Sequence, residues 1–341
     1  MPGMEPSTSP PWSRFDHLRP QDAAARVEGA VRRTPILPLP CDDPRIDLRG
    51  KMENHQETGS FKARGAWNNV SQLTDDERSR GVVASSSGNH GRALSWAAQR
   101  AGVPATIVMP ENAYPNKIQA CRDHEANVVL TPTRQGAEDE ALRLAEQGMV
   151  LIHPFDAERT IQGAGTVGVE IAEDWPEVDV VIVCVGGGGL ISGTSLALRQ
   201  TLGERVTILG AEPAGAPSLS RGVASGAAHH LNEITTKVQG LCPVYSGQIN
   251  VDVCSATVDR ILLLSDEEIY ATQARLVAAG EVVEPAGAAA TAAVLTGKLP
   301  EELFEQASAE GRKLRVCVVV SGGNPDPAQL EALRAQARNE A

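Results

Sequence analysis

The feature that most restricts the fold is an alternation of short apolar segments with amphipathic segments, which begins near residue 81. The apolar runs lead into turns that contain serine or proline, and apolar residues then recur with helical spacing. This alternation is typical of a parallel sheet whose strands are joined by right-handed helical crossovers. We predict strands over 81–85, 105–109, 127–131 and 149–153, and helices over 91–101, 116–126 and 137–147.

The same alternation returns in the second half of the chain. There we predict strands over 178–185, 206–211, 261–264 and 316–320, and helices over 190–200, 266–279, 286–295 and 326–337. Residues 214–250 have a poor pattern, so an irregular segment with one or two short helices is expected. Before residue 81, the sequence predicts a helix over 20–31 and strands over 36–39 and 47–53.

The chain has 341 residues and two separate runs of predicted strands. This is more than a single hydrophobic core usually accommodates. The predicted fold class is therefore α/β, with two open, twisted, mostly parallel sheets flanked by helices. We expect residues 21–56 and 155–341 to form a large domain and residues 57–154 to form a small one. The Pro- and Ser-rich residues 1–20 are expected to be a loose leader.

Composition excludes several classes of partner. A net charge of −12 gives no electrostatic attraction to nucleic acid or to an anionic membrane. The six cysteines are scattered without a CxxC pair, which argues against a zinc site or a disulfide framework. The sequence shows neither a signal-peptide pattern nor an apolar segment of membrane-spanning length, so we expect a cytoplasmic protein.

A single lysine lies in an unusual setting in the segment Thr58-Gly59-Ser60-Phe61-Lys62-Ala63-Arg64-Gly65. Lys62 follows an aromatic residue at the point where a Gly-Ser turn gives way to a helical pattern. An aldehyde cofactor needs a lysine with a lowered pKa beside a flat apolar wall, and Phe61 and Lys62 could supply both. A solvated lysine at the start of a surface helix is the alternative.

Four consecutive glycines, Gly186 to Gly189, stand between a predicted strand and the helix that begins at Leu190. Backbone N–H groups without side chains can converge there on an anion, and the helix N-terminus adds the positive end of its dipole. The segment lacks both the Walker pattern and the spaced GxGxxG pattern. It predicts a site for a compact phosphate monoester, with an ordinary glycine turn as the alternative.

Polar residues also follow two other predicted strands. Ser85-Ser86-Ser87-Gly88-Asn89-His90-Gly91 offers hydroxyl and N–H groups for a carboxylate, and the Asn89 amide can donate to a phenolate oxygen. An ordinary helix cap is the alternative for this stretch. Ser321-Gly322-Gly323-Asn324 follows the last strand, where the Ser321 hydroxyl could bind a ring nitrogen or simply belong to a turn.

Taken together and in this order, GSFKARGA, SSSGNHGRAL, GGGGLISG, EPAGAAATAAVL and VVVSGGN resemble the fold-type II pyridoxal-phosphate enzymes. The resemblance is to their serine/threonine dehydratase and serine racemase branch, and it implies a tryptophan synthase beta-like fold and pyridoxal 5'-phosphate as cofactor. Lys62 would form the Schiff base, and Ser87 would be a second catalytic residue. The other implied cofactor contacts are Phe61, Asn89, Gly186, Gly187, Gly188, Gly189, Leu190 and Ser321, and the implied substrate contacts are Ser86, Ser87, Gly88 and His90.

The resemblance also implies an activity. We expect a lyase, a dehydratase or ammonia-lyase that removes water and ammonia from a small β-hydroxy amino acid and leaves a 2-oxo acid. Threonine, serine and 3-hydroxyaspartate are the candidate substrates. An amino-acid (serine) racemase and a non-catalytic ligand-binding protein on the same fold remain as alternatives. We expect a homodimer or higher homo-oligomer.

Two positions depart from the family pattern. In members with a metal site, the strand-end glutamate that matches Glu212 is joined by a nearby acidic residue, whereas this sequence has Ser218 at about that place. We therefore expect no metal. The family's Ala-Asp-Gly segment is replaced by Leu231-Asn232-Glu233-Ile234-Thr235-Thr236, which leaves the identity of the substrate open.

Overall fold

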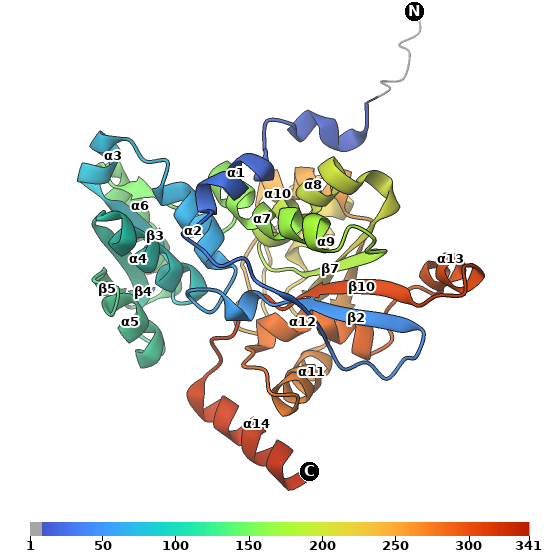
Figure 1. Cartoon of the computed structure of the whole chain (residues 1–341). Helices are drawn as coiled ribbons and strands as arrows, with labels where there is room; N and C mark the ends of the chain where they lie inside the picture. The colour runs from blue at the N-terminus through green and yellow to red at the C-terminus, as the bar shows by residue number, and fades with distance from the viewer. Residues whose placement is uncertain (1–8, 341) are drawn as a thin grey trace, which may run out of the picture.

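The larger of two sheets forms the centre of the molecule, which is described here by a computed structural model for residues 9–340. Its strand order is β1-β2-β10-β7-β8-β9, and only the edge pair of β1 and β2 is antiparallel (Figure 1). The strands are β1 (Ile36–Pro38), β2 (Ile46–Lys51), β7 (Val180–Cys184), β8 (Thr207–Pro213), β9 (Arg260–Leu264) and β10 (Leu314–Val319).

The smaller sheet is wholly parallel and has the strand order β5-β4-β3-β6. It contains β3 (Val82–Ser85), β4 (Ala105–Pro110), β5 (Asn127–Thr131) and β6 (Val150–Leu151). All four strands lie within residues 57–154. The division into a large and a small domain stays a prediction. The predicted fold class, with two mostly parallel sheets flanked by helices, is confirmed.

Helices cover both faces of the larger sheet, with α7 and α8 on one side and α11 and α12 on the other (Figure 1). In the first half of the chain the helices are α1 (Pro20–Val27), α2 (Lys62–Val70), α3 (Asp75–Arg80), α4 (Asn89–Ala101), α5 (Pro115–Arg122), α6 (Arg134–Glu146) and α7 (Glu158–Asp174). The remaining helices are α8 (Gly189–Leu202), α9 (Ser218–Ser225), α10 (Gln248–Thr257), α11 (Asp266–Ala278), α12 (Pro285–Leu295), α13 (Phe304–Ala309) and α14 (Pro327–Glu340).

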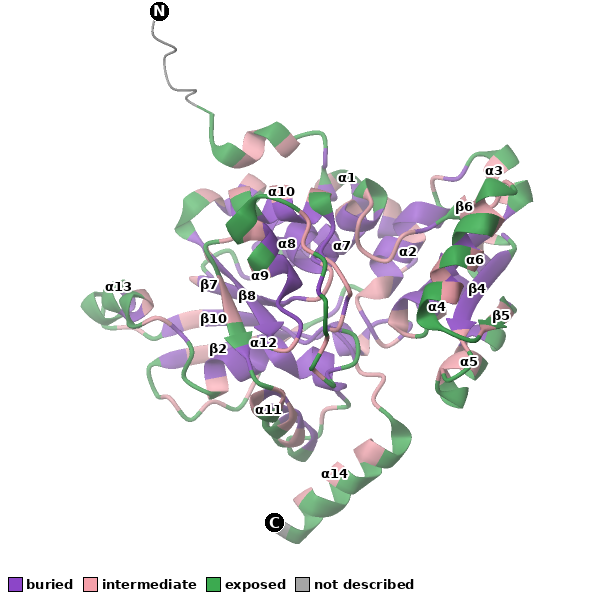
Figure 2. Ribbon diagram, turned by 180° about the vertical axis from the view of Figure 1, so that it is seen from behind, coloured by how far each residue is buried: buried purple, intermediate pink, exposed green. Residues whose placement is uncertain are grey.

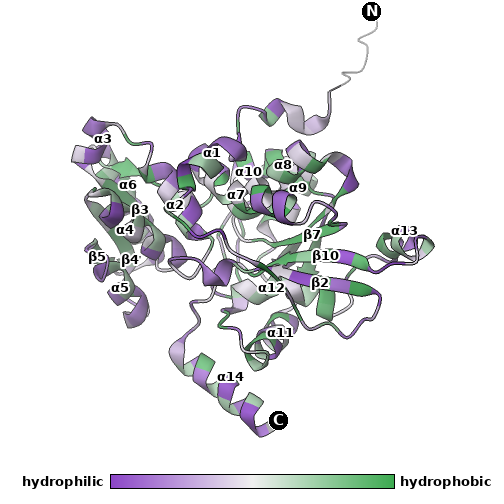
Figure 3. Ribbon diagram, in the orientation of Figure 1, coloured by the Kyte–Doolittle hydropathy of each residue, from purple (hydrophilic) through white to green (hydrophobic). Residues whose placement is uncertain are grey.

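The core follows the sheets. All five residues of β7 are buried, as expected for a central parallel strand with helices on both faces (Figure 2). Figure 3 shows β7 as hydrophobic and β2, nearer the sheet edge, as largely hydrophilic. A separate buried cluster, which includes Ala63, Ala66 and Val70 of α2, packs against the smaller sheet. In the described residues, no helix is both long and apolar enough to cross a membrane.

The N-terminal segment differs from the sequence prediction. Residues 1–8 of the expected loose leader lie outside the described residues, but Pro11–Phe15 form a short 3-10 helix. Leu18 is buried against Leu196 and Val253, and Trp12 and Phe15 pack partly buried against the same cluster, so the segment around Leu18 is packed and not loose. Its few apolar residues are too widely spaced to show a helical period, and only tertiary contacts order it.

The long helix α7 was not predicted from the sequence at all. It carries Gly163, Gly165 and Gly168, which lower helix propensity and hide its amphipathic period. The structure explains these glycines by close backbone contacts: a Cβ on Gly163 would lie 2.7 Å from Gly65 Cα of α2. Tertiary packing therefore outweighs the poor propensity.

Candidate active site

Lys62 begins α2, and its side chain is only partly accessible to solvent. The Lys62 ammonium donates a hydrogen bond of 2.6 Å to the carbonyl oxygen of Pro154 and lies 5.0 Å from the centroid of the Phe61 ring. Burial lowers the pKa of this ammonium to about 8. The neutral, nucleophilic form of the Lys62 amine therefore appears at lower pH than in an ordinary lysine.

The turn after β10 is joined directly to the segment that carries Lys62. The Phe61 N–H donates to the Ser321 carbonyl at 3.1 Å, and the Gly323 N–H donates to the Gly59 carbonyl at 2.7 Å. Ser60 and Gly322 form an antiparallel bridge between these two contacts. Two motifs about 260 residues apart in the sequence thus form one small hydrogen-bonded unit, which joins the Ser321 backbone to Phe61. The Ser321 hydroxyl itself donates to the Ala286 carbonyl at 3.4 Å.

The four glycines form a backbone cradle at the N-terminus of α8. Within residues 9–340, none of the N–H groups of Gly186–Gly189 donates to a protein acceptor. Gly188 has a φ of +102°, which side chains rarely tolerate. Unpaired N–H groups at a helix N-terminus are the arrangement that binds phosphate.

The cradle is held by a segment that sequence reasoning did not select. Phe155 follows β6, and its ring packs on Gly187 so closely that any Cβ there would overlap it. The Asn250 amide donates to the carbonyls of Phe155 (3.1 Å) and Gly187 (3.0 Å). The position of Phe155 after a predicted strand of the parallel sheet was the available signal, because ligands bind at such strand ends.

His153 was also missed. Its Nδ1 accepts hydrogen bonds from the N–H groups of Phe155 and Asp156, and its Nε2 donates to the Tyr245 hydroxyl at 2.9 Å. Burial and the nearby Lys62 lower the pKa of His153 to about 4. The ring is therefore neutral, and it orders the strand end beside Lys62.

The Ser86–His90 stretch lies at the end of β3, as predicted, but its side chains are used unequally. The Ser86 hydroxyl accepts from the N–H groups of Gly88 (3.3 Å) and Gly91 (3.1 Å), which is a capping role. Ser87 is exposed to solvent. His90 is buried and donates from Nε2 to the Ile152 carbonyl, and burial, together with Lys62, lowers its pKa to about 3.

Asn89 lies between the two sheets and already has protein partners. Its amide nitrogen donates to Glu284 Oε1 at 2.5 Å, and its amide oxygen accepts from Asn324 Nδ2 at 2.9 Å. Burial raises the pKa of the Glu284 carboxyl. The sequence contained Glu284 in one of the quoted motifs but gave no sign of its contact with Asn89.

Glu212 is the second-to-last residue of β8 and is fully buried. Its two carboxylate oxygens accept hydrogen bonds from the N–H groups of Leu219 (2.8 Å) and Ser220 (3.0 Å) in the first turn of α9. Burial raises the pKa of this carboxyl to about 7. Within residues 9–340, no group of three or more His, Cys, Asp and Glu side chains is arranged to hold a metal ion.

We predict from this geometry that activity survives removal of divalent metals. The helix N-terminus already satisfies both oxygens of Glu212. The measurement is the rate of ammonia release before and after dialysis against a chelator. Loss of most activity on chelation, with recovery on adding magnesium or calcium, would show that a metal site exists.

Comparison with known proteins identifies the family. A family model described as "Pyridoxal-phosphate dependent enzyme" matches residues 27–322. The chain belongs to this family. It is 40% identical to L-threonine ammonia-lyase of Thermotoga maritima over 83% of this chain and 68% of that one. It is 35% identical to phenylserine dehydratase of Ralstonia pickettii over 96% of this chain and 97% of that one.

The solved structures agree with this assignment. The structure of maize serine racemase superimposes with a TM-score of 0.84 and 33% identity, covering 94% of this chain and 97% of that one. The predicted fold-type II architecture, the pyridoxal-phosphate cofactor and the class of a pyridoxal-phosphate-dependent lyase are confirmed.

The residues present fit this cofactor. The unpaired N–H groups of Gly186–Gly189 suit its phosphate, and the partly neutral amine of Lys62 suits its aldehyde. The buried hydroxyl of Ser321, whose backbone is bonded to that of Phe61, is a neutral partner for a pyridine nitrogen.

Proposed function

We propose that this enzyme dehydrates and deaminates a small β-hydroxy amino acid to a 2-oxo acid and ammonia. The observation that carries the proposal is the Lys62 amine, with a pKa of about 8, on the same small unit as Ser321. Threonine, serine and 3-hydroxyaspartate are the proposed substrates, and the similarity to phenylserine dehydratase adds phenylserine to the set.

We assign the cofactor contacts as follows. The N–H groups of Gly186–Gly189 and the start of α8 at Leu190 would bind the phosphate, and Lys62 would hold the aldehyde carbon. Phe61 would supply an apolar surface, Asn89 would donate to the 3-hydroxyl, and Ser321 would face the pyridine nitrogen. A serine hydroxyl cannot protonate that nitrogen as an aspartic acid would, so the bound group is a weaker electron sink.

Pyridoxal phosphate, when bound, supplies an electron sink for the Cα–H bond of an amino acid. Lys62 is the base that takes the Cα proton, since its amine is partly neutral near pH 8. In the net reaction the Cα–H and Cβ–O bonds break and one water leaves. A second water then replaces the nitrogen, which gives the 2-oxo acid and ammonia.

The segment Ser86–His90 is proposed to bind the substrate carboxylate. The Ser86 hydroxyl fixes the turn by accepting from two N–H groups, and the exposed Ser87 hydroxyl can then donate to a ligand. Gly88 leaves space for a ligand to approach the turn, since no heavy atom lies within 4 Å of a Cβ built there. His90 supports the turn from behind through Ile152.

Racemisation is the second candidate function. It needs an acid or base on each face of the cofactor, and Ser87 would serve opposite Lys62. The overall similarity to maize serine racemase keeps this candidate open. Elimination is favoured because a weak electron sink shortens the lifetime of the carbanion that racemisation requires. The non-catalytic alternative is set aside because the chain belongs to an enzyme family.

The experiment that separates the two candidates measures ammonia and 2-oxo acid release beside inversion at Cα, for each of the four substrates. We expect elimination to outpace inversion for at least one of them. Ser87→Ala should raise KM by more than about tenfold, because one charge-assisted hydrogen bond contributes about 1.5–3 kcal/mol, and should leave the ratio of the two reactions unchanged. Inversion faster than elimination on every substrate would reverse the assignment.

We also propose a homo-oligomeric assembly and a cytoplasmic location, as expected from the sequence. Static light scattering measures the first directly. A mass equal to that of one chain of 36.0 kDa would contradict it.

A further inference from the structure

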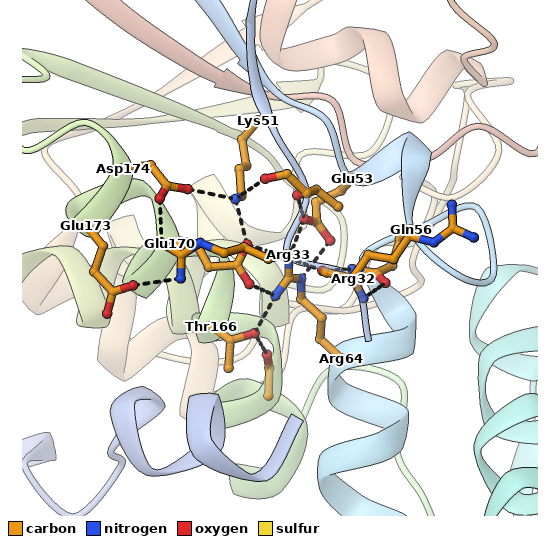
Figure 4. Close-up of polar contacts among 12 residues, drawn as sticks. Arg32, Arg33, Lys51, Glu53, Gln56, Arg64, Thr166, Glu170, Glu173 and Asp174 are labelled. Carbon is orange, nitrogen blue, oxygen red and sulfur yellow. Dashed lines mark hydrogen bonds and ion pairs between the residues drawn. The ribbon is translucent and has the colours of Figure 1, made fainter. Parts of the chain in front are cut away.

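A buried cluster of charged side chains lies behind the first turn of α2 (Figure 4). Its core consists of two cations, Lys51 and Arg64, and two carboxylates, Glu53 and Glu170. Arg64, Lys51 and Glu53 are 0% exposed, and Glu170 is 7% exposed. Charges as deeply buried as these are retained only when they are paired and hydrogen-bonded.

Arg64 is the centre of this cluster. Its Nε and Nη2 donate to the two oxygens of Glu53 at 2.8 and 2.7 Å. Its Nη1 and Nη2 donate to the two oxygens of Glu170 at 2.6 and 2.9 Å. Nη1 also donates to Thr166 Oγ1, and Nη2 to the carbonyl of Arg32. Every guanidinium nitrogen is therefore engaged, so the side chain has a single orientation.

Lys51 completes the charge balance. Its ammonium lies 2.6 Å from Glu170 Oε2 and 3.7 Å from Asp174 Oδ2, and it donates to the Thr34 carbonyl at 2.6 Å. Loss of Arg64 alone would leave two carboxylates in the core of the cluster, Glu53 and Glu170, with Lys51 as their remaining cation. A test of Arg64 therefore needs a second variant that restores the balance.

The cluster joins α2 to the larger sheet. Lys51 ends β2, Glu53 follows it, and Glu170 lies on α7, which covers that sheet. The opposite side of α2, with Ala63, belongs to the core of the smaller sheet. Arg64 thus ties the helix that carries Lys62 to elements of the other sheet.

Helix geometry links Arg64 to the direction of the Lys62 side chain. Each residue of an α-helix is rotated by about 100° from the one before it, so residues two apart point to nearly opposite sides of the helix. Arg64 accordingly points into the cluster, while Lys62 points toward the Pro154 carbonyl. Fixing the rotation of the first turn through Arg64 therefore fixes the direction of the amine.

The same helix is also fixed relative to the glycine cradle. A Cβ on Gly163 of α7 would lie 2.7 Å from the Arg64 carbonyl, and one on Gly193 of α8 would lie 2.8 Å from Gly165 Cα. The backbones of α2, α7 and α8 therefore touch with almost nothing between them. Lys62 and the cradle begin α2 and α8, so they belong to one closely packed set of helices.

We propose that Arg64 is a positioning residue, which holds the Lys62 amine at a fixed, partly desolvated place relative to the glycine cradle. The proposal rests on the proposed role of Lys62 as the residue that holds the cofactor. Without Arg64, the first turn of α2 loses its anchor and the amine becomes more exposed to water. Its pKa then rises from about 8 toward the ordinary lysine value of 10.5.

The experiment follows the capture of pyridoxal phosphate by apoprotein as a function of pH, together with kcat and KM. Arg64→Met combined with Glu53→Gln removes one charge of each sign and so keeps the cluster balanced. We expect this double variant to fold, to shift the pH midpoint of capture upward by at least about one unit, and to lower kcat more than tenfold with less than a threefold change in KM. Arg64→Lys, which keeps the charge, should fall between it and the wild type.

Arg199→Met is the matched control. Arg199 is 6% exposed, pairs with Asp259 and donates to backbone carbonyls, and lies near the end of α8 distant from the cradle. Its loss should lower thermal stability without moving the midpoint. The proposal is overturned if the double variant keeps the wild-type midpoint and kcat, or if Arg199→Met shifts the midpoint equally.

A separate experiment distinguishes failure of the proposed role of Arg64 from failure of the proposed role of Lys62. Borohydride treatment of wild-type protein fixes the cofactor on the lysine that holds it. A label on a lysine other than Lys62 would refute the role of Lys62, whatever the Arg64 variants do.

Discussion

Lys62→Ala is expected to abolish turnover, with a fall in kcat of at least about a thousandfold, since loss of a positioned base alone costs about 10²–10⁴-fold. The structure gives the reason: the Lys62 amine is partly buried, its pKa is lowered to about 8, and the backbone of its neighbour Phe61 is bonded to Ser321. The same residue should be labelled when wild-type protein with bound cofactor is reduced with borohydride and its peptides are mapped.

The pH dependence of this step follows from the direction of the pKa shift. Because the pKa of Lys62 is lowered to about 8, the neutral amine forms as the pH rises through 8 and not through 10.5. Capture of cofactor by apoprotein should therefore increase with pH across this lower range. Lys298→Ala, at a half-exposed lysine paired with Glu268, is the control and should behave as wild type. Near-normal turnover in Lys62→Ala would exclude the assigned role.

Gly187→Asp is expected to prevent stable binding of the cofactor. A carboxylate at this position would stand where the unpaired N–H groups of Gly186–Gly189 bind an anion. Two like charges about 4 Å apart repel by about 4 kcal/mol at an effective dielectric constant of 20, which corresponds to a loss of roughly a thousandfold in affinity. The measurement is the dissociation constant of pyridoxal phosphate for the apoprotein, by fluorescence titration.

A steric effect must be separated from this electrostatic one. Any Cβ at position 187 overlaps the ring of Phe155, so Gly187→Ala reports the clash without the charge. We expect the alanine variant to bind the cofactor more weakly than wild type but clearly more tightly than the aspartate variant. Equal affinities of the two variants would mean that the cradle does not hold the phosphate.

The sequence predicted the strands of the parallel sheets well because their signal is local. Buried parallel strands read as apolar runs, and β3, β4, β5, β7 and β9 all appear within a few residues of their predicted bounds. Helix α7 was missed because its glycines are explained only by contacts with α2 and α8. The packed segment around Leu18 was missed for a similar reason, since its partners, Leu196 and Val253, are far away in the sequence.

The residues of the candidate site also divide into those with a local signal in the sequence and those that depend on tertiary contacts. Lys62, the glycines and Ser321 could be selected from their local chemistry, and their order in the chain indicated the family. The contact between Asn89 and Glu284 and the support of the cradle by Phe155 and Asn250 could not be selected. Each depends on which side chains meet across two sheets, and that information is absent from local spacing.

The sequence by itself determined the α/β class, the family, the cofactor and the motifs that carry the chemistry, because these depend on residue type and on short-range pattern. Only the tertiary structure decided how those motifs meet. Pairing of β10 with β2 and β7 brings the Ser321 turn to the Phe61 backbone. Burial beside Pro154 lowers the pKa of Lys62. Desolvation is the physical reason, since the ionisation of a side chain depends on the whole environment that folding builds around it.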